Sequence, residues 1–172
     1  DTSTAHRTNP QWAYGFPELS NEFRSKILAS KRIAVPGCHA SGFCSIVAPL
    51  VANGVISPDY PITATSVTGY SGGGKKMIAE YEDEERSSLF DAPRQYALGQ
   101  THKHLPEMCK VTGLTNAPIF CPIVSDFYSG MVVTVPLFAS MLKNGATIDD
   151  VKKVYAEKDN TEITKYVENA DE

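Results

Sequence analysis

The spacing of apolar residues predicts a strand, a tight turn and a helix near the start of the chain. Residues 33–35 form a short β-branched stretch that leads into Pro36-Gly37, and a long, mostly apolar segment runs from Cys38 to about Gly54. This order is typical of a helix that begins at the cysteine. Pro49 inside the segment predicts a kink or an early stop, and Gly54 is a plausible C′ residue.

Other segments show the residue spacing typical of a helix or of a strand. Ser20 is expected to cap a helix through Ala29, with Phe23, Ile27 and Leu28 on one face. The remaining predictions are the end of a strand or a loop at 1–7, an ordered loop at 9–17, strands at 61–68, 119–124 and 131–135, a glycine-rich turn at 69–74, helices at 75–86 and 105–111, extended chain at 92–98, and a helix to about residue 157 capped by Thr147 and Asp150. Strands and helices are interspersed without a regular βαβ rhythm, which predicts an α+β domain with a mixed, largely antiparallel sheet covered by helices on one face.

Composition narrows the classes of partner. The 172 residues carry 16 Lys and Arg against 20 Asp and Glu, and this net charge of −4 argues against a nucleic-acid partner. No apolar run approaches the roughly 20 residues needed to span a bilayer, and no signal peptide is visible, so no membrane partner is expected. The chain begins with Asp1 rather than Met, which suggests a piece of a longer protein.

The four cysteines form no C-x-x-C pair, so a zinc site or a redox dithiol is unsupported, and reduced thiols in the cytoplasm fit best. Cys38 differs from the others by its place at the first turn of a helix. There it faces unpaired backbone N–H groups and the positive end of the helix dipole, which favour the thiolate. A nucleophile and a small buried structural residue both remain open on this run alone.

Two histidines follow in the run Thr101-His102-Lys103-His104-Leu105-Pro106-Glu107. In an extended segment His102 and His104 would point to the same side, and histidine can take and return a proton near neutral pH. Glu107, in the next helical turn, could orient a histidine or bind an ammonium or amide group. A metal site and an ordinary surface strand end are the alternatives.

The run Gly69-Tyr70-Ser71-Gly72-Gly73-Gly74-Lys75-Lys76 matches most of a phosphate-binding P-loop. Lys76 replaces the Ser or Thr that would hold magnesium. A loop near a substrate phosphate, with Gly72 and Gly73 as cofactor contacts, or a plain turn, competes with a nucleotide site. Arg7, after Ser3-Thr4-Ala5-His6, could pair with a carboxylate or phosphate or belong to a solvated loop.

Taken together, these segments resemble the N-acetyl-gamma-glutamyl-phosphate reductase family, relatives of glyceraldehyde-phosphate dehydrogenase and aspartate-semialdehyde dehydrogenase. The resemblance is to the shorter form, in which the cysteine is followed by His-Ala-Ser-Gly. It rests on four segments: residues 1–7, 36–38, 67–76 and 101–107. It implies a fold like the C-terminal domain of glyceraldehyde-phosphate dehydrogenase, with residues 1–37 as the tail of an NADP-binding Rossmann domain and residues 38–172 as the catalytic and oligomerisation domain.

The same resemblance implies an activity. Cys38 would form a thioester with N-acetyl-gamma-glutamyl phosphate, NADPH would reduce it to the semialdehyde, and His102 would be the acid/base partner. Arg7, Tyr96, His104 and Glu107 match positions expected near the substrate. NADP(H) would be bound mainly by sequence upstream of the chain, because no G-x-G-x-x-G occurs in it. The resemblance also implies a cytoplasmic homo-oligomer, a dimer or tetramer.

Two other classes of function compete with this enzyme. One is a nucleotide- or phosphate-binding module that uses residues 69–75. The other is a noncatalytic oligomerisation domain.

Overall fold

The computed structural model of the chain describes residues 1–158 and 162–168. The α-helices are α1 (Thr4–Arg7), α2 (Asn21–Ala29), α3 (Cys38–Ala52), α4 (Gly74–Glu82), α5 (Leu105–Thr112) and α6 (Ile148–Ala156). The strands are β1 (Ala13–Tyr14), β2 (Ile33–Ala34), β3 (Thr63–Gly69), β4 (Arg94–Gln95), β5 (Ile119–Ser125) and β6 (Met131–Thr134). Short 3₁₀ turns are η1 (Pro17–Leu19), η2 (Tyr70–Gly73), η3 (Ser88–Phe90), η4 (Ala139–Met141) and η5 (Lys143–Gly145).

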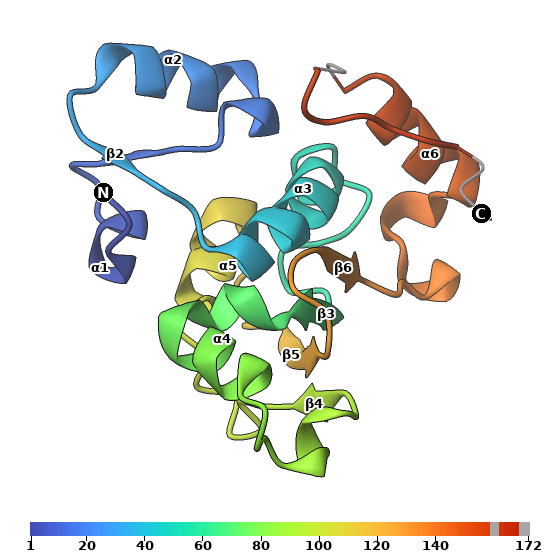
Figure 1. The fold of residues 1–172 in the computed structure, drawn as a ribbon. Helices are drawn as coiled ribbons and strands as arrows, with labels where there is room; N and C mark the ends of the chain where they lie inside the picture. Colours follow the sequence, from blue (N-terminus) through green and yellow to red (C-terminus); the bar gives the residue numbers. More distant parts are fainter. Residues whose placement is uncertain (159–161, 169–172) are drawn as a thin grey trace.

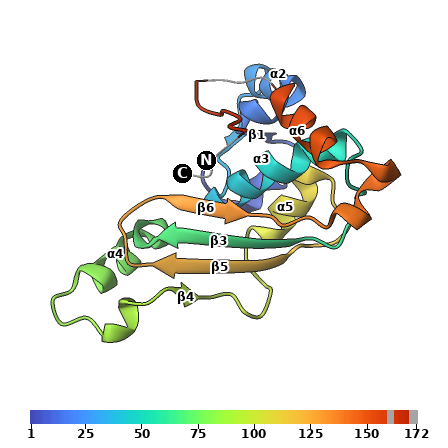
Figure 2. The same ribbon diagram turned by 90° about the vertical axis from the view of Figure 1, so that its right-hand side faces the viewer.

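Four strands form one mixed sheet in the order β4-β5-β3-β6, and β1 pairs with β2 in a separate parallel ribbon. Strand β5 runs parallel to β3, whereas β4 and β6 run antiparallel to their neighbours. Figure 2 shows the four strands side by side, and α3, α4 and α5 lie on one side of them in Figure 1. The predicted α+β fold with a mixed sheet and helices on one face is confirmed.

Buried and exposed side chains alternate along β3, and this alternation shows which face of the sheet is covered. Ala64, Ser66 and Thr68 are buried, whereas Thr63 and Thr65 are exposed, as the sequence pattern predicts. The buried face packs on the apolar side of α3, where Phe43, Val47 and Leu50 are fully buried. This packing fixes the start of α3 above the carboxyl ends of β3 and β5.

Several predicted boundaries are confirmed because they depend on local chemistry. Helix α3 begins at Cys38 after strand β2, and Gly54 follows its C-cap with a φ of +68°. The Ser20 hydroxyl accepts a hydrogen bond from the N–H of Phe23 at the start of α2. Thr147 and Asp150 form the expected capping box at α6.

Other local predictions were wrong. Residues 1–7, expected to be the end of a strand or a loop, instead contain a short helix, α1, and Arg7 at its end donates to the Val35 and Thr2 carbonyls. Of the kink or early stop expected at Pro49, the early stop is wrong, because α3 continues to Ala52. Leu28 is 82% exposed, although Phe23 on the same helix packs against the core. The helix expected at 75–86 ends at Glu82. The region expected to be extended at 92–98 includes strand β4, and extended chain is interrupted at Ala97, which has a φ of +53°.

Across residues 1–158 and 162–168, no helix is both long and apolar enough to cross a membrane.

Candidate functional site

A cavity of about 310 Å³ opens where α3 begins. Elements that are distant in the sequence meet around it: the turn before α3, the end of β3, the glycine turn η2, the residue after β4 and the turn before α5. Its walls come from Arg7, Pro36, Gly37, Cys38, His39, Thr68, Gly72, Gly73, Met77, Tyr96, His102, Lys103, His104 and Val124. Seven of the eight residues singled out from the sequence therefore meet here, and Glu107 is the one that does not line the cavity.

Cys38 is the first residue of α3 and its side chain is exposed to the cavity. Gly37 precedes it in an extended conformation, with φ −74° and ψ 141°. A Cβ at Gly37 would overlap the His104 ring and stand 2.7 Å from Nη1 of Arg7. Only glycine lets these two side chains pack directly against the turn that presents the thiol.

Glu107 holds the turn before Cys38 in place from behind. Its Oε1 accepts hydrogen bonds from the Gly37 backbone N–H and the Tyr14 hydroxyl, both at 2.8 Å. Its Oε2 accepts from Nη1 of Arg7 at 3.2 Å, and the Glu107 side chain is 1% exposed. Of the partners considered from the sequence, the carboxylate therefore takes a backbone amide, together with a guanidinium and a phenol, and no histidine.

Three of the five N–H donors of Arg7 are committed, to Glu107, Val35 and Thr2. The guanidinium still lines the cavity. Its orientation is thus fixed before any anion arrives, which lowers the entropy cost of binding a carboxylate or phosphate.

His102 and His104 lie next to each other, with ring centroids 4.6 Å apart. The prediction that the two rings lie on the same side is correct. The extended conformation on which that prediction was based is wrong, because His104 has a helical φ of −87° and ψ of −13° as the N-cap of α5. Burial and the nearby His102 lower the pKa of His104 to about 3, so its ring is neutral.

The tautomer of His102 follows from one backbone contact. The N–H of His104 donates to Nδ1 of His102 at 3.2 Å, so this nitrogen carries no proton. Neutral His102 therefore carries its proton on Nε2. Burial, with a smaller effect of the Lys103 charge, also lowers the pKa of His102 below its ordinary value. His102 is a neutral hydrogen-bond donor at pH 7.

His39 is a cavity residue that sequence reasoning missed. It is 3% exposed and makes a contact with a polar group on each side: Nδ1 lies 2.7 Å from the Ser66 hydroxyl and Nε2 lies 2.8 Å from the Tyr96 hydroxyl. Burial lowers the pKa of His39 to about 4, and burial together with the charge of Cys38 raises the pKa of Tyr96 to about 12. A histidine directly after the cysteine was a visible signal, but its partners were not.

The glycine turn lines the cavity opposite α3 without side chains at Gly72 and Gly73. Its first amides are already used, since the N–H groups of Tyr70 and Ser71 donate to the Phe127 and Tyr128 carbonyls. Lys76, in the place of the magnesium-binding hydroxyl, is exposed. These contacts argue against a P-loop, whose backbone donors point at phosphate.

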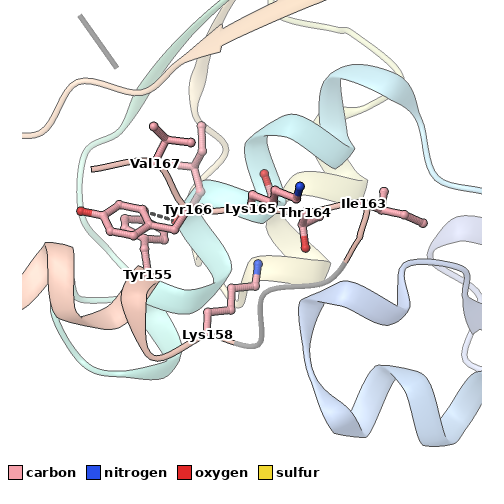
Figure 3. A pocket seen from close by; sticks show the side chains of 9 residues that line it. Tyr155, Lys158, Ile163, Thr164, Lys165, Tyr166 and Val167 are labelled. Carbon is pink, nitrogen blue, oxygen red and sulfur yellow. Dashed lines mark hydrogen bonds between the residues drawn. The ribbon is translucent and has the colours of Figure 1, made fainter. Parts of the chain in front are cut away.

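No group of three or more His, Cys, Asp or Glu side chains among the described residues is arranged to hold a metal ion. A second cavity, of about 360 Å³, lies between α3, α6 and residues 162–168 (Figure 3). Tyr155 forms one of its walls, stacks on Tyr166 and donates to the Ile46 carbonyl. It contains neither cysteine nor histidine, so the cavity at Cys38 is the better candidate for chemistry.

Comparisons with known proteins find similar sequences over most of the chain. Residues 38–170 match the family model described as semialdehyde dehydrogenase, dimerisation domain. A protein named N-acetyl-gamma-glutamyl-phosphate reductase from Rhizobium johnstonii is 45% identical over 152 residues, which cover 88% of this chain and 49% of the relative. One of the same name from Sinorhizobium medicae is 41% identical over 175 residues, or 99% and 56%. The chain spans about half the length of these curated relatives.

Solved structures support the fold. A crystal structure of aspartate semialdehyde dehydrogenase II from Vibrio cholerae superposes with a TM-score of 0.66 at 16% identity, covering 92% of this chain and 52% of that one. Aspartate semialdehyde dehydrogenase from Francisella tularensis gives 0.60 at 11% identity, covering 93% and 55%.

Proposed function

Since the chain belongs to the semialdehyde dehydrogenase dimerisation-domain family, we propose that the protein containing it reduces an acyl phosphate to an aldehyde. The substrate we propose is N-acetyl-gamma-glutamyl phosphate and the product is N-acetylglutamate semialdehyde, a step of arginine biosynthesis. The name shared by the curated relatives supports this choice. The observation that carries the proposal is an exposed thiol at the first residue of a helix, in a cavity with Arg7 and His102.

In the proposed mechanism the Cys38 thiolate attacks the acyl carbon, the bond from that carbon to the phosphate oxygen breaks, and phosphate leaves. The first-turn N–H groups of α3 lack intrahelical partners and stabilise the oxyanion. Neutral His102 adds a hydrogen bond from Nε2, as the tautomer fixed by His104 allows. After reduction of the thioester, collapse of the thiohemiacetal breaks the C–S bond and restores the thiolate.

The reductant supplies a hydride to the thioester carbon, and we assign it to NADPH. Gly72 and Gly73 present backbone atoms to one wall of the cavity, which lets a flat ring approach the chain closely. The chain has no G-x-G-x-x-G, so most contacts to the dinucleotide would come from other parts of the full-length protein. Residues 1–37, with the two-residue strands β1 and β2, would be the tail of that nucleotide domain, and the catalytic domain would start at residue 38.

We also propose that the protein assembles as a homo-oligomer through the uncovered face of the sheet. Ile119 on β5 and Val132 on β6 are 59% and 64% exposed there, on the two strands that flank β3, whose Thr63 and Thr65 are also exposed. A cytoplasmic location would keep the free Cys38 thiol reduced.

The assay that tests this function follows NADPH oxidation by the full-length protein. With N-acetyl-gamma-glutamyl phosphate, one phosphate should be released for each NADPH consumed. Omitting the acyl phosphate, or replacing it with N-acetylglutamate, should abolish the signal, because a free carboxylate offers no leaving group. NADPH oxidation without phosphate release would contradict the acyl-phosphate mechanism.

The protonation of His102 predicts the acid side of the pH profile. Burial lowers the pKa of His102 below 6.5, so its ring is neutral at pH 7 and gains a proton only in more acidic solution. A proton on Nδ1 would break the hydrogen bond from the His104 N–H. We expect kcat/KM to fall only on the acid side of the ordinary histidine range, as His102 gains a proton. His102→Asn should lower the rate and remove this limb, and an unchanged profile would exclude His102.

A noncatalytic oligomerisation domain is the second candidate, favoured by the exposed apolar residues of the sheet face. It predicts that the full-length protein associates normally and oxidises no NADPH in the same assay.

A further inference from the structure

We propose that Ser66 and His39 form a hydrogen-bonded relay that positions Tyr96 as a donor to the sulfur of Cys38. The inference rests on the proposed function, because it assumes that Cys38 acts as a thiolate. Ser66 lies on β3, His39 is the second residue of α3, and Tyr96 follows β4. The relay joins three elements that the sequence places 27 and 57 residues apart.

Ser66 and Tyr96, the two ends of the relay, are held next to each other because both pair with the same residue of β5. Ser66 is the register partner of Pro122 on β5, and the Tyr96 N–H donates to the Pro122 carbonyl at 3.1 Å. His39 reaches across from α3 and contacts both hydroxyls, at 2.7 and 2.8 Å. Its ring is held edge-on against Phe120, with centroids 5.3 Å apart. The ring therefore has little freedom to rotate away from either partner.

The direction of the hydrogen bonds follows from satisfying the buried donors. Ser66 is fully buried, and within the part of the chain that the structure describes His39 is the partner recorded for its hydroxyl. If Nδ1 of His39 carried the proton, the Ser66 O–H would be left without an acceptor, at a cost of about 1–3 kcal/mol. The Ser66 hydroxyl therefore donates to Nδ1, Nε2–H donates to the Tyr96 oxygen, and the Tyr96 O–H is free to donate into the cavity.

Cys38 is the acceptor that the cavity offers to this O–H. Both residues line it, and the charge of Cys38 is one of the two causes that keep Tyr96 protonated. The other titratable or charged groups around the cavity are Arg7, His39, His102, Lys103 and His104. His39 and His104 are neutral near pH 7, and the variants below alter none of the cationic groups.

The test measures the pH dependence of iodoacetamide alkylation in the full-length protein, with each cysteine followed by peptide mass spectrometry. In the wild type Cys38 should react faster than Cys109 and Cys121 at neutral pH. In Tyr96→Phe the midpoint of Cys38 alkylation should rise by about one pH unit, because a hydrogen bond to the thiolate is lost. Tyr128→Phe, at an exposed tyrosine outside the cavity, is the matched control and should leave it unchanged.

Variants of His39 and Ser66 separate a relay from simple packing. His39→Phe removes both hydrogen bonds and should raise the Cys38 midpoint as much as Tyr96→Phe, with no further rise in the double variant. His39→Gln retains a donor to Tyr96 and should return the midpoint toward the wild-type value. Ser66→Ala, which perturbs the core least, should raise it by a smaller amount.

Each outcome decides the question. A Tyr96→Phe midpoint equal to that of the wild type overturns the relay while leaving the nucleophile intact, provided that Cys38 is the fastest cysteine. A shift in His39→Phe without one in Tyr96→Phe also overturns it. If Cys38 reacts no faster than Cys109 and Cys121 in the wild type, the proposed function fails, and the relay fails with it.

Discussion

Replacing Cys38 with serine in the full-length protein should reduce reductase turnover by about a thousandfold or more, because a serine hydroxyl is not ionised near neutral pH. The folded structure should be unaffected. The Cys38 side chain is exposed at the first residue of α3, and it fills no buried space. A change of one exposed atom should alter the free energy of unfolding by less than about 0.5 kcal/mol.

The matched control is Cys121→Ser. Cys121 is half-buried on β5 and does not line the cavity, so this variant should retain turnover. The pair is measured by NADPH oxidation and by denaturant unfolding of the same preparations. Turnover retained in Cys38→Ser would remove this residue from the mechanism, whereas loss in both variants would indicate a general effect of replacing cysteines.

The position of Cys38 at the start of a helix could be predicted because it depends on neighbouring residues in the sequence. A β-branched stretch ends at Pro36-Gly37, and the apolar periodicity of the next 15 residues can only be buried as a helix. Gly54 closes the helix with a positive φ that other residues rarely adopt. The segment therefore predicts that the thiol lies at the first helical residue, while the turn before it is also held by Glu107 from a distant helix.

The surroundings of Cys38 were harder to predict because they depend on contacts between distant segments. Glu107 binds the Gly37 amide across 70 residues, and His39 reaches Tyr96 across 57. No periodicity encodes such a pairing, since it depends on how β3, β5 and α5 pack. Glu107 was expected to orient a histidine or to bind an ammonium or amide group, and of these the structure gives it an amide, the backbone N–H of Gly37.

His102 and His104 lie next to each other as predicted, but the backbone conformation from which this proximity was predicted was wrong. Their proximity was inferred from the two-residue repeat of a strand. In the structure the segment is a turn, and the rings meet because His104 is the N-cap of α5 and its N–H donates to His102. A two-residue separation fits both geometries, so the spacing alone could not distinguish them.

Replacing Glu107 with alanine should produce the largest loss of stability among the site variants, about 3–5 kcal/mol in the free energy of unfolding. The Arg7 guanidinium, 9% exposed, would lose its only recorded carboxylate partner in the described structure. The Gly37 N–H and the Tyr14 hydroxyl would lose their acceptor at the same time. Denaturant unfolding of the full-length protein measures this loss, and Glu22→Ala at the exposed Glu22–Lys26 pair should cost less than about 0.5 kcal/mol.

A double variant distinguishes the buried charge from the missing hydrogen bonds. In Glu107→Gln the Arg7 charge remains without compensation, but an amide oxygen can still accept a hydrogen bond. Adding Arg7→Met removes that charge, so Arg7→Met/Glu107→Gln should be more stable than the sum of the two single losses predicts. Strict additivity would show that the pair is not coupled. Arg7 also lines the cavity, so turnover should stay low in the double variant even where stability recovers, and the free energy of unfolding is therefore the measurement that tests the coupling of the pair.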